Sequence, residues 1–296
     1  MSKMSEVLET ALKHKHIKEV LDDMDKADEY LEKRAAEEDE PYKLPKLIYH
    51  TEVKIKEMFG RQVISFNENE SSKDIILYLH GGAYINQIDS LQVSFCDKLA
   101  KKTKATIFAP LYPLAPNHTY KETYQFVEKL YEWILEFEKP VTVMGDSAGG
   151  GLTAAFCEYL ANNQIELPKQ LILISPWVDV SMSGDYEKYR DLDPMLGIEA
   201  LPKVGEAWSG DFYTKYYKVN PLFGNVEKLP PTKIFVGTHE VFYPDILTFY
   251  NKLKDYDVDV ELFVGEEMPH VYPIYPVIPE SKEGFNEIVD IILDDS

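Results

Sequence analysis

The residues with the clearest chemical potential form a short run around a serine. Residues 145–149 read Gly-Asp-Ser-Ala-Gly and match the pattern G-x-S-x-G, with Ser147 at the centre. The run follows an apolar Val-Thr-Val-Met stretch and precedes a helical pattern, which is the strand–turn–helix context that the motif requires. A sharp turn of this kind lifts the hydroxyl out of a sheet and sets it at a helix N-terminus, where negative charge is stabilised. The pattern predicts that Ser147 is a nucleophile for acyl transfer.

A second motif, His-Gly-Gly-Ala-Tyr at 80–84, directly follows the strand-like run Ile-Ile-Leu-Tyr-Leu. Acyl transfer develops an oxyanion on the former carbonyl oxygen, and backbone N–H groups aimed at that oxygen lower the barrier. Because glycines allow close backbone approach, we expect Gly81 and Gly82 to be donors, with the Ala148 amide as the third. A glycine pair after a strand can also be a simple turn, but its position upstream of the serine motif favours an oxyanion hole. We interpret His80 as a residue that braces this loop rather than as the catalytic base.

Two histidines, His239 and His270, lie downstream of the serine and are the candidates for the base. In hydrolases with this serine turn the triad follows the chain order serine, acid, histidine. His270 lies just past the apolar run at 258–264, at the end of a predicted strand. His239 directly precedes Glu240, a candidate for the acid. A histidine at this position could not easily contact both the serine and a separate acid. We therefore predict His270 as the base.

Two carboxylates compete for the role of the acid. Glu240 follows the strand-like run Lys-Ile-Phe-Val-Gly. Its role would be to fix the tautomer of His270 and to stabilise the imidazolium. Asp245 follows a proline in the first turn of the next predicted helix, where an acid is usually a dipole or capping residue. We predict Glu240 as the acid and leave a backup role for Asp245 open.

Alternating strands and helices would position these residues. Short apolar runs, several of them nearly continuous, predict strands that are buried on both faces. The predicted strands lie at 61–66, 75–80, 105–110, 141–145, 171–175, 233–237 and 258–264, and helical patterns lie at 91–102, 119–137, 148–163, 245–255 and 281–293. The alternation predicts an α/β fold, in which a mainly parallel sheet carries helices on both faces.

Two segments stand outside this alternation. Residues 1–40 are strongly charged, with apolar residues at helical spacing, and fit either a solvated amphipathic helix pair or part of a lid. Residues 181–220 carry many aromatic residues among charges and glycines, and fit either a variable surface excursion or a cap. We favour a cap for the second segment and predict one domain over 1–296.

Composition narrows the possible partners. The 296 residues carry a net charge of −20, which repels nucleic acid and anionic membrane surfaces. No apolar run reaches membrane-spanning length and no signal peptide is apparent, so we expect a cytoplasmic protein. Cys96 and Cys157 imply no disulfide framework and fit buried thiols. No metal motif is present, and His14 and His16 lie on a charged helical stretch, so we expect neither a metal nor a cofactor.

Taken together, these motifs resemble those of the hormone-sensitive-lipase-like esterases, the bacterial carboxylesterase branch of the α/β-hydrolases. The resemblance runs from about Ile75 to Tyr272 and includes the runs Tyr-Pro-Leu-Ala-Pro at 112–116, Leu-Ile-Ser-Pro-Trp at 173–177 and Asp-Pro-Met at 193–195. It implies the α/β-hydrolase fold, with the N-terminal helices and the later insertion forming a small helical cap, here 1–40 and 181–220.

The sequence departs from the family pattern at two positions. Ala83 stands where the family commonly has a third glycine, and Glu240 stands where aspartate is usual. Glutamate is one methylene longer than aspartate but chemically adequate.

The expected reaction is two-step acyl transfer, in which His270 takes the Ser147 proton as the hydroxyl attacks an ester carbonyl. We expect small or short-acyl esters, because a capped, acidic enzyme suits these better than lipid interfaces. Two alternatives stay open: an amide hydrolase or deacetylase on the same triad, and a non-catalytic small-molecule binder. The expected partner is a small-molecule ester, and a homo-oligomer is possible.

Overall fold

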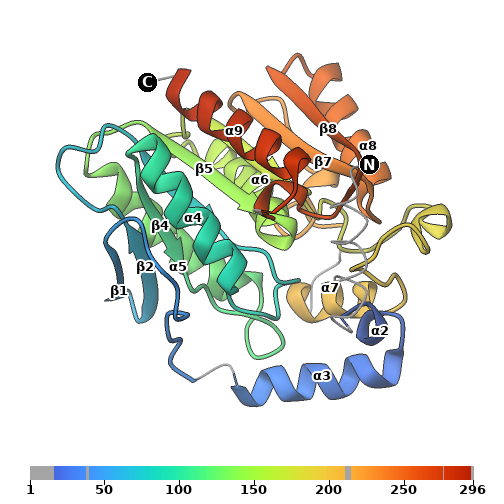
Figure 1. The fold of residues 1–296 in the computed structure, drawn as a ribbon. Coiled ribbons are helices and arrows are strands. Elements are labelled where there is room, and N and C mark those ends of the chain that lie inside the picture. The colour runs from blue at the N-terminus through green and yellow to red at the C-terminus, as the bar shows by residue number, and fades with distance from the viewer. Residues whose placement is uncertain (1–16, 38–39, 211–214, 276, 295–296) are drawn as a thin grey trace.

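An eight-stranded sheet forms the centre of the molecule (Figure 1). The computed structural model describes residues 17–37, 40–210, 215–275 and 277–294. The strands are β1 (Val53–Met58), β2 (Arg61–Phe66), β3 (Ile75–Leu79), β4 (Thr106–Pro110), β5 (Val141–Asp146), β6 (Gln170–Ile174), β7 (Thr232–His239) and β8 (Val260–Pro269). Their order in the sheet is β1-β2-β4-β3-β5-β6-β7-β8. β2 pairs antiparallel with β1 and β4, and all other neighbours are parallel.

The register of the central strands aligns the loops that carry the motifs. Leu79 at the end of β3 pairs with Gly145, and Gly145 pairs with Leu173 of β6. Because parallel strands end at the same edge of a sheet, the glycine loop after β3 and the serine turn after β5 leave the sheet side by side. The strands β3, β4, β5 and β6 are buried along their whole length, as their aliphatic runs predict.

One strand was not predicted. β1 reads Val-Lys-Ile-Lys-Glu-Met, and its residues are half-buried except for Lys54 and Glu57, which are exposed. It lies at the edge of the sheet and pairs only with β2 among the described strands. An antiparallel edge strand needs one apolar face only, so its sequence lacks the continuous aliphatic run on which the other predictions rested.

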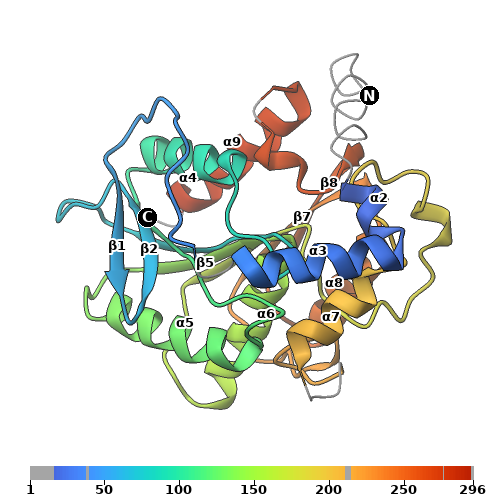
Figure 2. The ribbon, with the colours of Figure 1, turned by 90° about the horizontal axis from the view of Figure 1, so that it is seen from below.

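Helices cover both faces of the sheet. They are α2 (Ile17–Leu21), α3 (Met24–Glu37), α4 (Ser90–Thr103), α5 (Tyr120–Leu135), α6 (Ser147–Asn162), α7 (Leu201–Ser209), α8 (Tyr243–Asp255) and α9 (Pro279–Asp294), with short 3₁₀ helices η1 (Glu187–Tyr189), η2 (Pro221–Phe223) and η3 (Tyr272–Ile274). α4 and α9 lie on one face, and α5, α6 and α8 lie on the other (Figures 1 and 2). Each face has its own hydrophobic core. Cys96 in α4 and Cys157 in α6 are buried free thiols, as predicted.

The segments predicted as cap elements contact each other where the structure describes them. Ala200 N–H donates to Leu21 O at 2.8 Å, and Ile198 N–H donates to the Asp22 carboxylate at 3.0 Å. An ion pair joins Lys203 of α7 to Asp28 of α3. Figure 2 shows α2, α3 and α7 gathered at one end of the sheet. Residues 1–16, which include the two N-terminal histidines considered as metal ligands, and residues 38–39 and 211–214 lie outside the described residues.

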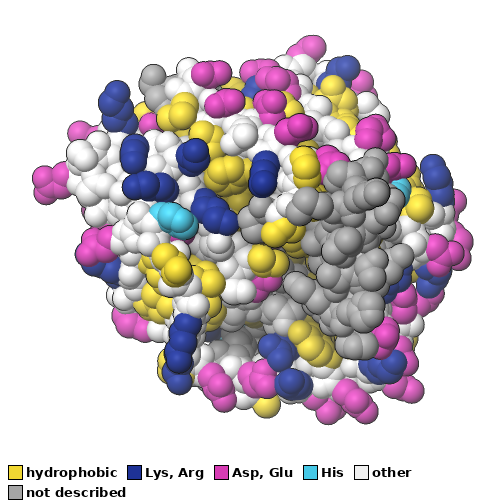
Figure 3. Space-filling model, viewed as in Figure 1, with side chains coloured by type: hydrophobic (Ala, Val, Ile, Leu, Met, Phe, Trp, Pro, Cys, Tyr) yellow, Lys and Arg dark blue, Asp and Glu magenta, His cyan; other side chains and the backbone are white. Residues whose placement is uncertain are grey.

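Acidic side chains are spread widely over the face of the molecule drawn in Figure 3, whereas basic side chains gather over α4. Within the part of the chain that the structure describes, no helix combines the length and the apolar character needed to cross a membrane.

Candidate active site

Three predicted residues form a hydrogen-bonded chain at one edge of the sheet. Ser147 begins α6 directly after β5, Glu240 follows β7, and His270 follows β8. The Ser147 Oγ lies 2.8 Å from His270 Nε2, and His270 Nδ1 lies 3.1 Å from Glu240 Oε2. Glu240 is fully buried and His270 is nearly so. A hydroxyl, an imidazole and a carboxylate in this order can activate the hydroxyl as a nucleophile.

The serine sits on a strained turn. Its φ is +53°, a left-handed conformation that is uncommon for residues other than glycine. The turn fits because the residues around it are small: a side chain at Gly145 would meet Gly149 O at 2.4 Å, and one at Gly149 would meet Leu79 O at 2.0 Å. The strain is therefore held by close backbone packing between β3, β5 and α6, and it presents the hydroxyl above the sheet.

The position of His270 is fixed by the residue that follows it. Val271 has a φ of +54°, and its N–H donates to the Ser175 hydroxyl oxygen at 2.9 Å. Burial alone would lower the pKa of His270, but the hydrogen bond and the charge of Glu240 raise this pKa above its ordinary value. The arrangement stabilises an imidazolium, which is the state that forms when the serine loses its proton.

A second buried carboxylate, that of Asp193, holds the backbone beside Glu240. Asp193 Oδ2 accepts the Val241 N–H at 2.9 Å, and its other oxygen accepts the Met195 N–H at 2.7 Å. Its charge also raises the pKa of His270. Asp193 thus holds the backbone next to Glu240 while adding negative potential at the histidine. The sequence named Asp193 only through its Asp-Pro-Met resemblance, and no spacing signal linked it to β7.

The structure does not bring Asp245 to the histidine. Its carboxylate accepts a hydrogen bond of 2.6 Å from the Tyr186 hydroxyl, and burial raises the pKa of Asp245 to about 7. Asp245 lies in the first turn of α8, so its contact joins that helix to the segment 181–220.

The glycine loop after β3 differs from the prediction at one amide. The Gly81 N–H donates to Asp146 Oδ1 at 2.9 Å, which contradicts its assignment as a free oxyanion donor. Among the described residues, no acceptor is recorded for the N–H groups of Gly82 and Ala83. The Ala148 amide belongs to the first turn of α6, where N–H groups have no partner within the helix. The loop therefore offers Gly82 and Ala83, rather than Gly81 and Gly82, beside Ala148.

Asp146 is the anchor of this loop. It is buried, and besides the Gly81 amide it accepts hydrogen bonds from the Tyr78 hydroxyl at 2.5 Å and from the Gln92 amide at 2.8 Å. Because Gln92 also caps the start of α4, one carboxylate joins β3, β5 and α4. Asp146 occupies the first x of G-x-S-x-G. The motif accepts any residue at this position, so no function was predicted for Asp146.

His80 braces the loop, consistent with its interpretation from the sequence. It is fully buried, its ring stacks on Tyr112 with the centroids 4.4 Å apart, and its Nδ1 lies 2.8 Å from Gly81 O. Burial lowers the pKa of His80 to about 4, so the ring is neutral near pH 7.

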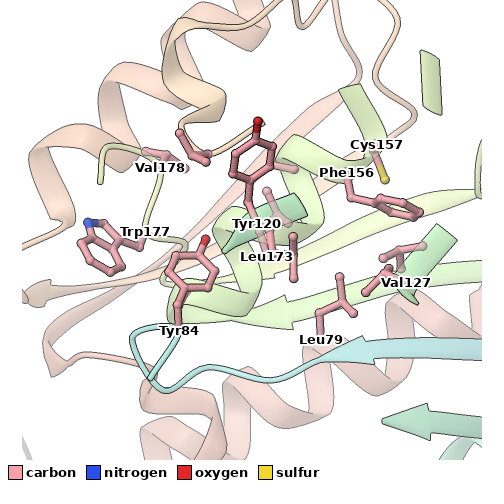
Figure 4. Close-up of a cluster of buried hydrophobic side chains, with 14 of the residues drawn as sticks. Leu79, Tyr84, Tyr120, Val127, Phe156, Cys157, Leu173, Trp177 and Val178 are labelled. Carbon is pink, nitrogen blue, oxygen red and sulfur yellow. The ribbon is translucent and has the colours of Figure 1, made fainter. Parts of the chain in front are cut away.

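Aromatic rings connect α7 to His270. Tyr84, which follows the loop amides, stacks on Trp208 with centroids 4.0 Å apart and on Trp177 at 5.8 Å. Figure 4 shows Tyr84 and Trp177 side by side. Trp177 stacks on Phe242 at 5.5 Å, and Phe242 meets the His270 ring edge-on at 5.2 Å. The rings form a continuous packed row between the glycine loop, α7 and the histidine.

No group of three or more histidine, cysteine, aspartate or glutamate side chains that could hold a metal ion occurs among the described residues.

Comparison with known proteins places the chain in a family. A family model described as alpha/beta hydrolase fold matches residues 76–274. The chain is 28% identical over 226 residues to an esterase of Acinetobacter venetianus, covering 74% of this chain and 75% of the relative. It is 28% identical over 214 residues to an acetyl-hydrolase of Streptomyces hygroscopicus, covering 71% of this chain and 72% of the relative. A solved hormone-sensitive lipase from a metagenome library superposes with a TM-score of 0.79 at 27% identity, covering 88% of this chain and 91% of that one.

These matches confirm the fold and the resemblance to hormone-sensitive-lipase-like esterases that the motifs predicted. The family model spans both the glycine loop and the histidine, so the match includes the whole candidate site. The chain belongs to the α/β-hydrolase family.

Proposed function

We propose that this protein hydrolyses small or short-acyl carboxylic esters, with Ser147 as the nucleophile, His270 as the base and Glu240 as the acid. The observation that carries the proposal is the hydrogen-bonded chain of these three residues, with contacts of 2.8 and 3.1 Å, where β5, β7 and β8 end. A protein that only binds a ligand needs no such chain. The family and the esterase relatives support the same reaction.

The reaction proceeds in two steps. His270 Nε2 takes the Ser147 proton as Oγ attacks the ester carbonyl, and the oxyanion accepts hydrogen bonds from the Gly82, Ala83 and Ala148 amides. The imidazolium then protonates the leaving alcohol, which leaves an acyl group on the serine. Water attacks this acyl-enzyme by the same proton path and releases the carboxylic acid.

The short-acyl preference rests on what fills the space around the glycine loop. Trp177 and Trp208 are fully buried, and both pack against Tyr84, the residue that follows the proposed donors. Large fixed rings at this point restrict the room for a long acyl chain. The relative from Streptomyces hygroscopicus is named an acetyl-hydrolase, which agrees with a preference for short acyl groups.

We further propose that residues 1–40 and 181–220 act as a cap within a single domain. Two contacts support it beyond those between the segments: the Tyr30 hydroxyl of α3 donates to Asn86, two residues after the aromatic Tyr84, at 2.6 Å, and Asn117 donates to Ala35 O at 2.8 Å. Deleting residues 1–37 should widen the accepted range of acyl lengths. An unchanged range in a folded deletion variant would contradict the cap.

The net charge of −20 supports a dissolved small-molecule ester as the partner, rather than nucleic acid or an anionic membrane, and we propose that the enzyme acts in the cytoplasm. Fractionation of cells that express the untagged protein tests this compartment, and activity in the membrane pellet would oppose it.

The test of the reaction is hydrolysis of p-nitrophenyl esters, from acetate to laurate, by wild type and Ser147→Ala. Ser94→Ala, a serine-to-alanine change in α4, is the matched control. We expect turnover that peaks at short chains, persists in the control and is lost in Ser147→Ala. Activity that survives Ser147→Ala would overturn the proposal. Turnover of p-nitroacetanilide faster than of the acetate ester would favour the amide-hydrolase alternative.

A further inference from the structure

A small apolar pocket lies between α4 and α9, away from the three residues of the candidate triad. Its volume is about 230 Å³, and its apolar walls include Phe95, Ile274 and Phe285. The two phenylalanine rings meet edge to face with centroids 5.6 Å apart and bring α4 and α9 together. The volume is below the range of drug-sized ligand pockets, so the pocket suits a small ligand.

Three lysines surround this pocket. Lys98 and Lys102 lie one turn apart on α4, and Lys282 lies on the first turn of α9. No ion pair with another described residue is recorded for any of the three, although the whole chain has 51 acidic and only 31 basic residues. Figure 3 shows basic side chains over α4 with hydrophobic side chains between them and α9. An apolar pocket with unpaired cations around it is complementary to an amphipathic anion.

The start of α9 also favours an anion at this pocket. Ser281 and Lys282, both in the first turn of this helix, line the pocket. The backbone N–H groups at a helix N-terminus carry partial positive charge, so this end of α9 adds to the attraction that the lysines exert on a carboxylate.

From these observations we propose that the pocket binds a small aliphatic carboxylate. Its alkyl chain lies against Phe95 and Phe285, and its carboxylate is held by Lys98 and Lys282. Carboxylates of this class are also the acid products of ester hydrolysis, but the binding proposal does not depend on that reaction. Ile274, in the pocket wall, lies four residues after His270, so the ligand would contact the segment that follows the histidine.

The experiment is calorimetric titration of the full chain with sodium octanoate at low salt. We expect saturable binding that weakens on the order of tenfold in the double variant Lys98→Ala/Lys282→Ala, because two ion pairs are lost. Lys101→Ala removes the same charge from α4 but does not line the pocket, so it should bind octanoate as wild type does. Asn286→Trp, at a pocket residue, should block binding without changing any charge.

Two further measurements separate this site from the catalytic one. Ser147→Ala should bind octanoate at the pocket unchanged, whatever its effect on ester hydrolysis, so the two proposals fail independently. The neutral 1-octanol should bind wild type and the double variant equally and more weakly than octanoate. Absence of saturable binding, equal octanoate affinity in wild type and the double variant, or 1-octanol affinity equal to that of octanoate would each overturn the proposal.

Discussion

Replacement of Glu240 by glutamine tests the assignment of the acid most directly. In the reaction, His270 becomes positively charged next to a buried carboxylate 3.1 Å away. At an effective dielectric constant of about 20, two unit charges at this separation attract by about 5 kcal/mol. Glutamine removes this attraction and allows the wrong imidazole tautomer. Complete loss of this attraction would slow acyl transfer by nearly 10,000-fold, since each 1.36 kcal/mol of activation free energy is about tenfold in rate.

We expect a somewhat smaller effect, because Asp193 also stabilises positive charge on His270 and remains in the variant. The predicted fall in kcat/KM for a short p-nitrophenyl ester is therefore roughly 1,000-fold for Glu240→Gln. Glu240→Asp, which keeps the charge on a shorter side chain, should recover part of that loss.

Asp245→Asn is the matched control, because it neutralises the other carboxylate that the sequence left open. Asp245 contacts Tyr186 rather than the histidine, so kcat/KM should stay within about threefold of wild type. Equal losses in the two variants, or a Glu240→Gln enzyme within about tenfold of wild type, would refute the assignment of Glu240.

Three further predictions concern titration and packing. Glu240 raises the pKa of His270, and only the neutral imidazole can accept the serine proton. The value of kcat/KM should therefore fall as the pH drops through this raised pKa. In a pH–rate profile, Glu240→Gln should move this fall to lower pH. Burial raises the pKa of Glu158 well above its ordinary 4.5, so the folded chain retains a proton that the unfolded chain releases, and stability falls as pH rises through this window. Glu158→Gln should therefore raise Tm relative to wild type more at about pH 8 than at about pH 4, and an equal change at both would contradict this reasoning. Trp208→Ala should cost about 3–5 kcal/mol in urea unfolding, since the ring is fully buried against Tyr84, and a loss under about 1 kcal/mol would argue against that packing.

Patterns that depend on local chemistry were predictable from the sequence. The buried strands are largely aliphatic runs, and the serine turn has glycines two residues before and two residues after Ser147 because no side chain fits at either position. His270 and Glu240 could be selected because each follows such a run. Each of these features depends on a few neighbouring residues, so their signals are present in short stretches of sequence.

Features set by contacts between distant segments were not predictable in this way. The Gly81 amide is engaged by Asp146, which lies 65 residues away in the chain. The contact of Asp193 with Val241 joins an insertion to the segment just after β7, across 48 residues. Neither pairing produces a recognisable residue spacing, because many polar residues at those positions would fit the local pattern equally well. β1 was missed for a different reason. An antiparallel edge strand needs apolar residues on one face only, so its sequence lacks a continuous apolar run.

The row of rings from α7 to the histidine allows the candidate site to be followed by intrinsic tryptophan fluorescence. The chain has only three tryptophans, and two of them, Trp177 and Trp208, belong to that row. The third, Trp133 of α5, packs instead against Phe108 and Phe137. In a Trp133→Phe protein, all intrinsic tryptophan emission would come from rings packed against Tyr84 beside the proposed donors. Movements of α7 during turnover would then be visible in real time without an attached dye.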